Sequence, residues 1–391
     1  MTSRRSALLL PAALGACALP VRHPAVPVAD LSRARIVGLE NERFHASALT
    51  EGLRREFAEA VARRRRHLGL AGGQPMPGGF DLLAVSGGGE DGAFGAGLLT
   101  AWRDRPRFNL VTGVSTGALT APFAFLGPEW DDGLRQVYTE VTLADVAVPR
   151  GMLAALFDDA MADTAPLFRT ISRMLDGRML AAIAEEHRRG RLLFVATTNL
   201  DSATPVVWNM GAIAASGHPR ALDTVRRILL ASAAIPGAFP PVLFDVELDE
   251  RRHQELHVDG GAIAQAFLYP EALGADRRAL LRAGRPVVPI RAWLIRNGRM
   301  DAAWASTDRR TLTIAQRAVA TMIAAGGYHD AIRIWLNAER DGVEFRVAWI
   351  GPEFDVPYSA PFEAAYMRAL FAHGQRRMRE GTAWRREPPL A

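Results

Sequence analysis

The sequence predicts an α/β fold with a mainly parallel central sheet, and three observations support this prediction. An apolar strand over 80–85 enters a run of glycines and is followed by a helix over 93–102. A second strand over 108–112 enters another glycine-bearing turn and a helix over 116–125. Strands and helices continue to follow one another toward the C-terminus, and strands joined by helices pair in parallel.

Apolar periodicity predicts the remaining elements. Residues 44–67 repeat an apolar side chain every four positions, which is typical of a helix. Residues 141–190 have a mostly helical pattern and are expected to cover the end of the sheet where a ligand binds. We expect further strands at 192–197, 206–209, 242–246, 256–258, 291–295 and 344–350, and further helices at 221–233, 312–325 and 362–378.

The N-terminus has the pattern of a bacterial export signal. Arg4 and Arg5 precede a short apolar run that ends in small residues and Cys17, the only cysteine of the chain. Leu14–Cys17 resembles a lipobox, which implies cleavage before Cys17 and acylation of that residue. The alternative is an ordinary secretory signal with an incidental cysteine. We expect a signal peptide over 1–16 and a lipid-anchored tether over 17–43.

Because Ala18 follows the cysteine, the same resemblance implies an outer-membrane protein that faces the periplasm. An N-terminal helix over 44–75 is then expected to precede the main domain.

The first glycine run could hold a phosphate or an oxyanion. Gly87, Gly89 and Gly92 fit the dinucleotide pattern G-x-G-x-x-G. That pattern needs an acidic residue about 20 positions further on, at the end of the second strand, and the stretch 108–113 has none. A Walker A phosphate loop requires lysine, and all 47 basic residues of this chain are arginine. Both nucleotide-binding interpretations are therefore rejected.

The second turn favours acyl transfer. Ser115 stands between Gly113 and Gly117 in the sequence GVSTG, directly after an apolar strand. A serine in such a strand-to-helix turn has an exposed hydroxyl, and its neighbours two positions away must be small. The amides of the first glycine run can then receive the negative oxygen of a tetrahedral intermediate.

Asp259 is the best candidate for the base that takes the serine proton. It ends an apolar strand in the sequence LHVDGG, where Gly260 and Gly261 leave the backbone open. None of the nine histidines follows a strand in a comparable turn. His257 is the first histidine to consider if Asp259 is not the base.

These motifs resemble those of the patatin-like phospholipases. SGGGEDGAFGAG, GVSTG and VDGG occur in the family's order within residues 80–270. The resemblance implies a three-layer α/β/α sandwich, a Ser-Asp dyad of Ser115 and Asp259, and no metal or cofactor. It also implies an oxyanion hole made by Gly87, Gly88 and Gly89, with Gly92, Gly113, Gly117, Gly260 and Gly261 as motif glycines.

The resemblance implies a hydrolase domain over 76–391 that cleaves carboxylic ester bonds of lipids. One departure concerns the substrate: Asp91 occupies the position where many family members carry arginine or lysine. A phospholipid, a lysolipid and a neutral ester therefore all remain candidate substrates. The alternatives are a broad carboxylesterase and a lipoprotein that binds lipid without catalysis. No nucleic-acid partner is expected, and the sequence leaves the oligomeric state open.

Overall fold

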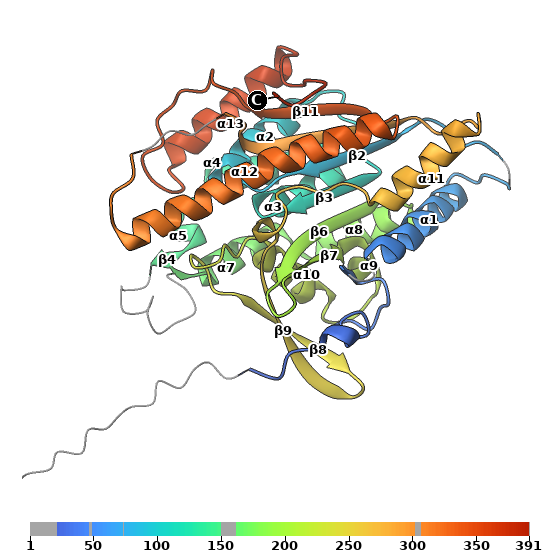
Figure 1. The fold of residues 1–391 in the computed structure, drawn as a ribbon, viewed down its shortest axis with the longest axis horizontal. Coiled ribbons are helices and arrows are strands. Elements are labelled where there is room, and N and C mark those ends of the chain that lie inside the picture. The colour runs from blue at the N-terminus through green and yellow to red at the C-terminus, as the bar shows by residue number, and fades with distance from the viewer. Residues whose placement is uncertain (1–21, 47–48, 73, 150–161, 302–305, 391) are drawn as a thin grey trace, which may run out of the picture.

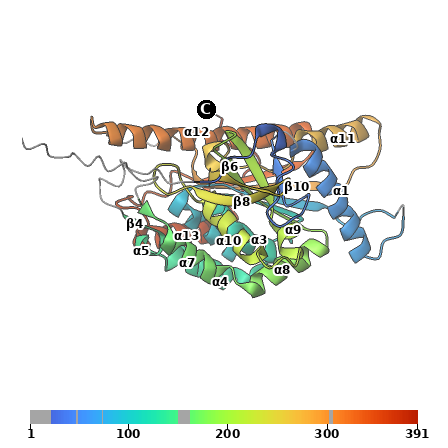
Figure 2. The same cartoon turned by 90° about the horizontal axis from the view of Figure 1, so that it is seen from below.

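The computed structural model describes residues 22–46, 49–72, 74–149, 162–301 and 306–390. Within them, helices cover both faces of a nine-stranded, mainly parallel sheet, as the sequence predicted (Figure 1). Figure 2 separates the three layers. One helical layer contains α1 (Leu49–His67), α11 (Glu271–Arg282) and α12 (Thr311–Arg340). The other contains α2 (Gly92–Ala101), α3 (Thr116–Leu126), α4 (Asp131–Thr139), α5 (Leu143–Val146), α7 (Ala165–Met174), α8 (Gly177–Arg188), α9 (Met210–Ala215), α10 (Ala221–Ser232) and α13 (Ala364–Arg379).

Five parallel strands form the centre of the sheet. Their spatial order is β6 (Leu192–Asn199), β3 (Leu110–Val114), β2 (Phe80–Val85), β10 (Ile290–Arg299) and β11 (Glu344–Ile350). The antiparallel strands β7 (Thr204–Asn209) and β1 (Arg43–His45) extend the sheet beyond β6, and the hairpin of β8 (Val242–Leu248) and β9 (Arg251–Asp259) pairs with the end of β6. A separate short hairpin joins β4 (Val148–Pro149) and β5 (Ala162–Asp163).

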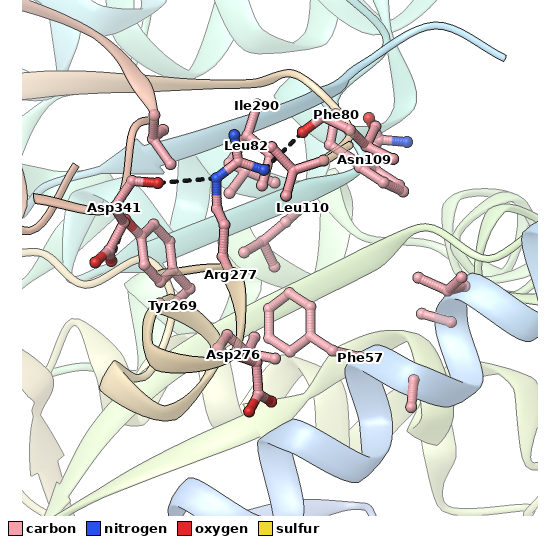
Figure 3. A pocket seen from close by; sticks show the side chains of 18 of the residues that line it. Phe57, Phe80, Leu82, Asn109, Leu110, Tyr269, Asp276, Arg277, Ile290 and Asp341 are labelled. Carbon is pink, nitrogen blue, oxygen red and sulfur yellow. Dashed lines mark hydrogen bonds between the residues drawn. The ribbon is translucent and has the colours of Figure 1, made fainter. Parts of the chain in front are cut away.

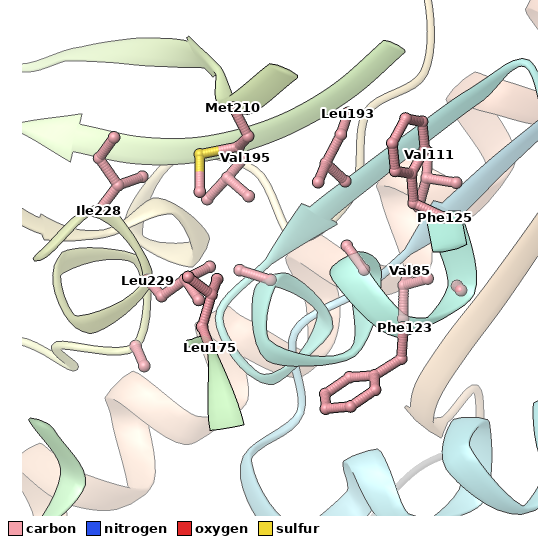
Figure 4. Packing of buried hydrophobic residues seen from close by; sticks show 14 of the residues in the cluster. Val85, Val111, Phe123, Phe125, Leu175, Leu193, Val195, Met210, Ile228 and Leu229 are labelled. Carbon is pink, nitrogen blue, oxygen red and sulfur yellow. The ribbon is translucent and has the colours of Figure 1, made fainter. Parts of the chain in front are cut away.

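Side chains that alternate along each central strand bury both faces of the sheet. In β2, Leu83 and Val85 belong to the apolar core under α3, whereas Leu82 and Ala84 belong to the core under α12. This alternation follows from the two-residue repeat of a strand. Figure 4 shows side chains of neighbouring strands packed against Phe125 of α3. Each such large side chain contributes about 1.5–3 kcal/mol to the stability of the fold when it is fully buried. The strands that carry the turns are therefore firmly packed.

Residues 22–43, which their composition predicted to be part of a tether, pack against the domain instead. Val26, Leu31 and Ile36 are buried in the core under α3. The buried carboxylate of Glu42 accepts a hydrogen bond of 2.6 Å from the amide of Ile36. Apolar side chains scattered among prolines therefore suffice to fix this segment to the domain. The part of the expected tether that includes Cys17, and the expected signal peptide, lie outside the described residues.

Several other elements differ from their predicted bounds. The N-terminal helix begins at Leu49, because Arg43–His45 forms β1 and pairs with β7. The helix expected at 312–325 continues to Arg340 as α12. Helices α4, α9 and α11 were not predicted. The described part of 141–190 contains α5, α7 and α8, which agrees with the expected helical pattern.

Candidate active site

Ser115 occupies a strained turn between β3 and α3. Its backbone has φ 55° and ψ −126°, a conformation that side-chain-bearing residues adopt rarely. A Cβ atom added to Gly113 would lie 2.5 Å from the carbonyl oxygen of Gly117, and one added to Gly117 would lie 2.1 Å from the carbonyl oxygen of Val85. The turn therefore requires both glycines for lack of space, as the sequence predicted.

A buried serine on α10 holds this turn. The amide of Ser115 donates a hydrogen bond of 3.0 Å to Oγ of Ser232, and that hydroxyl donates to the carbonyl oxygen of Ala196 at 2.7 Å. Ala196 belongs to β6, the neighbour of β3. The strained turn is thus tied to the sheet through one side chain that the sequence analysis did not identify.

Strands β3 and β9 meet end to end along one edge of β6. Val114, the last residue of β3, is paired with Ala196, and Asp259, the last residue of β9, is paired with the next residue of β6, Thr197. Because β3 is parallel to β6 and β9 is antiparallel, their C-terminal ends face each other. This register brings Ser115 and Asp259 together, although 143 intervening residues separate them in sequence.

The carboxyl of Asp259 is buried beside the serine. It is 4% exposed, and it accepts a hydrogen bond of 2.7 Å from the amide of Gly261. Burial raises the pKa of Asp259 to about 7, against smaller lowering effects of its hydrogen bonds to the Ser115 side chain and to Gly261. A carboxylate is a weak base at its ordinary pKa, and this environment makes Asp259 a considerably stronger one.

The glycine loop after β2 also approaches Ser115. A Cβ atom added to Gly87 would lie 3.1 Å from Cβ of Ser115. Gly88 has φ 156°, and a Cβ atom there would lie 1.9 Å from the carbonyl oxygen of Asn297. Gly89 has φ 58° and borders open space. Only glycine fits the crowded position 88.

The three amides of this loop are not equivalent. Gly87 donates its amide to the carbonyl oxygen of Gln265 at 3.1 Å, so this N–H is already engaged. Within the described part of the chain, the amides of Gly88 and Gly89 have no hydrogen-bond acceptor. The expected three-amide oxyanion hole is therefore reduced to two available donors, Gly88 and Gly89.

The remaining motif glycines serve close packing. A Cβ atom added to Gly92 would lie 2.4 Å from Oγ1 of Thr116, and one added to Gly260 would lie 2.6 Å from the carbonyl oxygen of Ala196. A Cβ atom at Gly261 would lie 2.4 Å from Nε2 of Gln265. Substitution of these glycines would separate the loop, the turn and the end of β9.

His257 is engaged elsewhere. Its Nδ1 lies 2.8 Å from Oγ1 of Thr197 and its Nε2 lies 3.0 Å from the carboxylate of Glu255, and the ring is fully buried. Burial also lowers the pKa of His257, more than Glu255 raises it. Both ring nitrogens are thus occupied within the β6–β9 contact, which leaves Asp259 as the group beside Ser115.

Asp91 is half-buried in the glycine loop and faces α13. The hydroxyl of Tyr366 donates to its Oδ1 at 2.8 Å. Burial raises the pKa of Asp91 to about 6, and the tyrosine hydrogen bond opposes this shift. In the described part of the chain, Asp91 is therefore accommodated by a hydroxyl donor rather than by an ion pair.

Polar residues at the end of β10 support the same loop, and the sequence analysis missed them. Asn297 donates its backbone amide to Oγ of Ser86 at 2.9 Å and its Nδ2 to the carbonyl oxygen of Ser86 at 3.0 Å. Arg296 donates to the carbonyl oxygen of Gly87 at 3.1 Å. The sequence did contain a signal, because Arg-Asn-Gly directly follows the apolar strand expected at 291–295.

A small apolar cavity of about 60 Å³ opens beside the candidate nucleophile. Gly89 and Ser115 line it together with apolar side chains that include Leu119, Leu167 and Phe239. This volume holds a few water molecules. A long acyl chain would therefore require these side chains to move.

A larger cavity of about 720 Å³ lies between α1, α11 and the starts of the central strands (Figure 3). Leu82, Leu110 and Ile290 line it, and they lie near the starts of β2, β3 and β10. The guanidinium of Arg277, which also lines the cavity, donates hydrogen bonds to the carbonyl oxygens of Asp341 and Val288. This cavity is separate from the Ser115 site.

No candidate metal site and no membrane-spanning helix is found in the described ranges. There, His, Cys, Asp and Glu side chains do not gather in groups of three or more that could bind a metal ion. The helices of the same ranges are too short or too polar to cross a bilayer.

The family model for patatin-like phospholipases matches residues 83–270, from within β2 to the segment after β9. The chain carries a patatin-like phospholipase domain. The match spans a little under half of the chain and includes the glycine loop, Ser115 and Asp259. No curated protein matches the chain. The matched domain is typical of lipid acyl hydrolases, whereas β10, β11, α12 and α13 lie beyond the match.

Proposed function

We propose that this protein cleaves carboxylic ester bonds of lipids through a covalent acyl-enzyme on Ser115. The observation that carries the proposal is the meeting of Ser115 and a buried Asp259 at one edge of β6, beside two unoccupied glycine amides. A pocket that only binds lipid has no need of a strained serine with a buried carboxylate next to it.

The reaction follows from this geometry. The Asp259 carboxylate accepts the proton of the Ser115 hydroxyl while Oγ attacks the ester carbonyl carbon. The carbonyl oxygen becomes negative and accepts hydrogen bonds from the amides of Gly88 and Gly89. Collapse expels the alcohol, which takes the proton from Asp259. Water then loses a proton to Asp259 and attacks the acyl-enzyme, which releases the carboxylic acid and restores Ser115.

The charges around the loop favour an ester without an anionic headgroup near the glycine loop. Glu90 and Asp91 stand there, where a cation would attract a phosphate, and Glu90 lines the small cavity. The apolar walls of that cavity suit the hydrocarbon part of an acyl group. A monoacylglycerol or a simple acyl ester fits these features better than a diacyl phospholipid.

The test uses the chain from Ala18 onward and its Ser115→Ala variant. A diacyl phospholipid, a lysophospholipid, a monoacylglycerol and a p-nitrophenyl ester are offered, and a fluorophosphonate probe is mapped by mass spectrometry. We expect hydrolysis that Ser115→Ala abolishes, and a label on Ser115. The matched control is Ser202→Ala, which removes a serine from the turn before β7 and should keep full activity. Absence of both hydrolysis and label in the wild-type chain would refute the proposal and favour the lipid-binding alternative.

We also propose that the protein is a lipoprotein of the bacterial envelope, on the strength of the Leu14–Cys17 lipobox. Radiolabelled palmitate should enter the wild-type protein in cells and should be absent from a Cys17→Ala variant. A mature protein without lipid, recovered from the soluble periplasmic fraction, would contradict this assignment.

A further inference from the structure

We propose that Arg296 is a positioning residue that orients the amide of Gly88 toward the oxyanion. This inference rests on the function proposed above and adds a residue to its machinery. Arg296 belongs to β10, which lies outside the segment matched by the family model. The glycine loop is therefore contacted by a buried arginine from a strand beyond the matched segment.

The structure provides a fitted space for this side chain. Arg296 is 4% exposed, and its Nη1 donates to the carbonyl oxygen of Gly87 at 3.1 Å and lies 3.3 Å from Oγ of Ser86. A Cβ atom added to Gly327 of α12 would lie 2.4 Å from Cζ of Arg296, and one added to Gly298 would lie 3.0 Å from it. Two glycines thus leave room for one buried guanidinium.

Peptide geometry carries the effect of Arg296 to the oxyanion site. In a planar trans peptide, the C=O of one residue and the N–H of the next point in opposite directions. Arg296 holds the carbonyl oxygen of Gly87 together with the hydroxyl of Ser86, which donates to it at 2.7 Å, so the N–H of Gly88 is directed away from these two donors. The amide of Gly87 is held as well, by the carbonyl oxygen of Gln265. With both sides of Gly87 fixed, the peptide that follows it has little freedom to rotate.

The charge balance indicates that Arg296 acts through this hydrogen bond rather than through a long-range field. The carboxylates of Asp91 and Asp330 both raise the pKa of the guanidinium, although its burial lowers that pKa more. These two carboxylates partly offset the positive charge of the guanidinium, which favours a local hydrogen bond over a long-range field. Asp330 also accepts hydrogen bonds from the amides of Gln265 and Ala266, which links α12 to the same support.

The experiment compares Arg296→Met, Arg296→Gln and Arg296→Lys in the chain from Ala18 onward. Loss of one oxyanion donor reduces the rate by roughly 100- to 1000-fold, and a misdirected donor should have part of this effect. We expect Arg296→Met and Arg296→Gln to reduce kcat by about 10- to 100-fold with little change in KM. Arg296→Lys keeps a cationic donor and should retain a kcat several-fold above that of Arg296→Gln. The rate of fluorophosphonate labelling should fall in the same order.

The matched control is Arg291→Met, at the opposite end of β10, where Arg291 pairs with Asp81 at 2.8 Å. It should leave kcat unchanged. Equal kcat of folded wild-type, Met and Gln variants would overturn the inference while the proposed function stands. If Arg296→Met does not fold, Arg296→Lys is compared with Arg296→Gln, and equal kcat values of these two variants overturn the inference. A wild-type chain without hydrolysis or label would instead refute the proposed function, and the inference with it.

Discussion

Replacement of Asp259 by asparagine should make the protein more stable at alkaline pH while it removes activity. Burial raises the pKa of Asp259 from 3.8 to about 7. Ionisation of this carboxyl is therefore harder in the folded chain than in the unfolded chain. At about 1.4 kcal/mol per pH unit, that difference corresponds to about 4 kcal/mol of lost stability above pH 7. Asparagine has no charge, and its Oδ1 can still accept the hydrogen bond from Gly261.

The sign of this effect changes the expected result with pH. A raised pKa of an acid means that its contribution to stability is fully present below pH 3.8 and is lost as the pH rises through 7. Urea unfolding of the wild type and Asp259→Asn should differ by about 4 kcal/mol at pH 8.5 and by less than about 2 kcal/mol at pH 5. The wild-type kcat/KM should rise about tenfold per pH unit below pH 7 and then level off.

Two outcomes would refute this reasoning. A variant that is equally or less stable than the wild type at both pH values would mean that the Asp259 carboxylate is well solvated or stabilised by a partner. Substantial activity in Asp259→Asn would mean that another group removes the Ser115 proton. Ser202→Ala serves as the control for both measurements, because Ser202 lies in the turn before β7 and its hydroxyl contacts only Thr204 among the side chains described.

Three further substitutions or conditions test the fold around the site. In a denaturant titration, Gly117→Ala should destabilise the protein by about 3 kcal/mol or more, because the added Cβ would lie 2.1 Å from a carbonyl oxygen of β2. The control Gly177→Ala should be near neutral in the same titration, because nothing lies within 4 Å of its added Cβ. Ser232→Ala leaves the amide of the candidate nucleophile without its acceptor and should remove about 1–3 kcal/mol, together with part of kcat; unchanged unfolding and kinetics would contradict this. Burial lowers the pKa of His45 and of His187 from 6.5 to about 3. Because the unfolded chain then binds these protons more readily than the folded chain, each histidine should reduce the free energy of unfolding by about 1.4 kcal/mol per pH unit as the pH falls from 6.5 toward 3. A melting temperature that is constant over this range would disprove the prediction.

The sequence predicted the parts of the fold that depend on local pattern. The strands at 80–85 and 344–350 have their predicted bounds, because each is rich in apolar side chains and begins after a glycine-containing break. The turn around Ser115 was predicted from the local pattern G-x-S-x-G, and the steric cause at Gly113 is local, because a Cβ atom there would meet Gly117. Where a structure follows from neighbours along the chain, residue patterns were sufficient.

The missed features depend on contacts between distant segments. The engagement of the Gly87 amide depends on Gln265, and no local pattern shows this bond. The support from Arg296 depends on β10 lying next to β2, which the sequence order does not specify. The N-terminal segment was interpreted from its proline and arginine content, whereas its few apolar side chains decide where it packs.

Because β3 and β9 lie end to end along β6, the distance between Ser115 and Asp259 depends on the register of these strands. The segment between β6 and β9 includes two strands, β7 and β8, two helices, α9 and α10, and their connections. The position of Asp259 depends on the pairing of β9 with β6 rather than on the length of these connections. A shift of β9 by one residue along β6 would turn Asp259 to the opposite face of the sheet. Insertions in the connections should therefore be tolerated, whereas a single insertion within β9 would separate the acid from the serine while most of the fold persists.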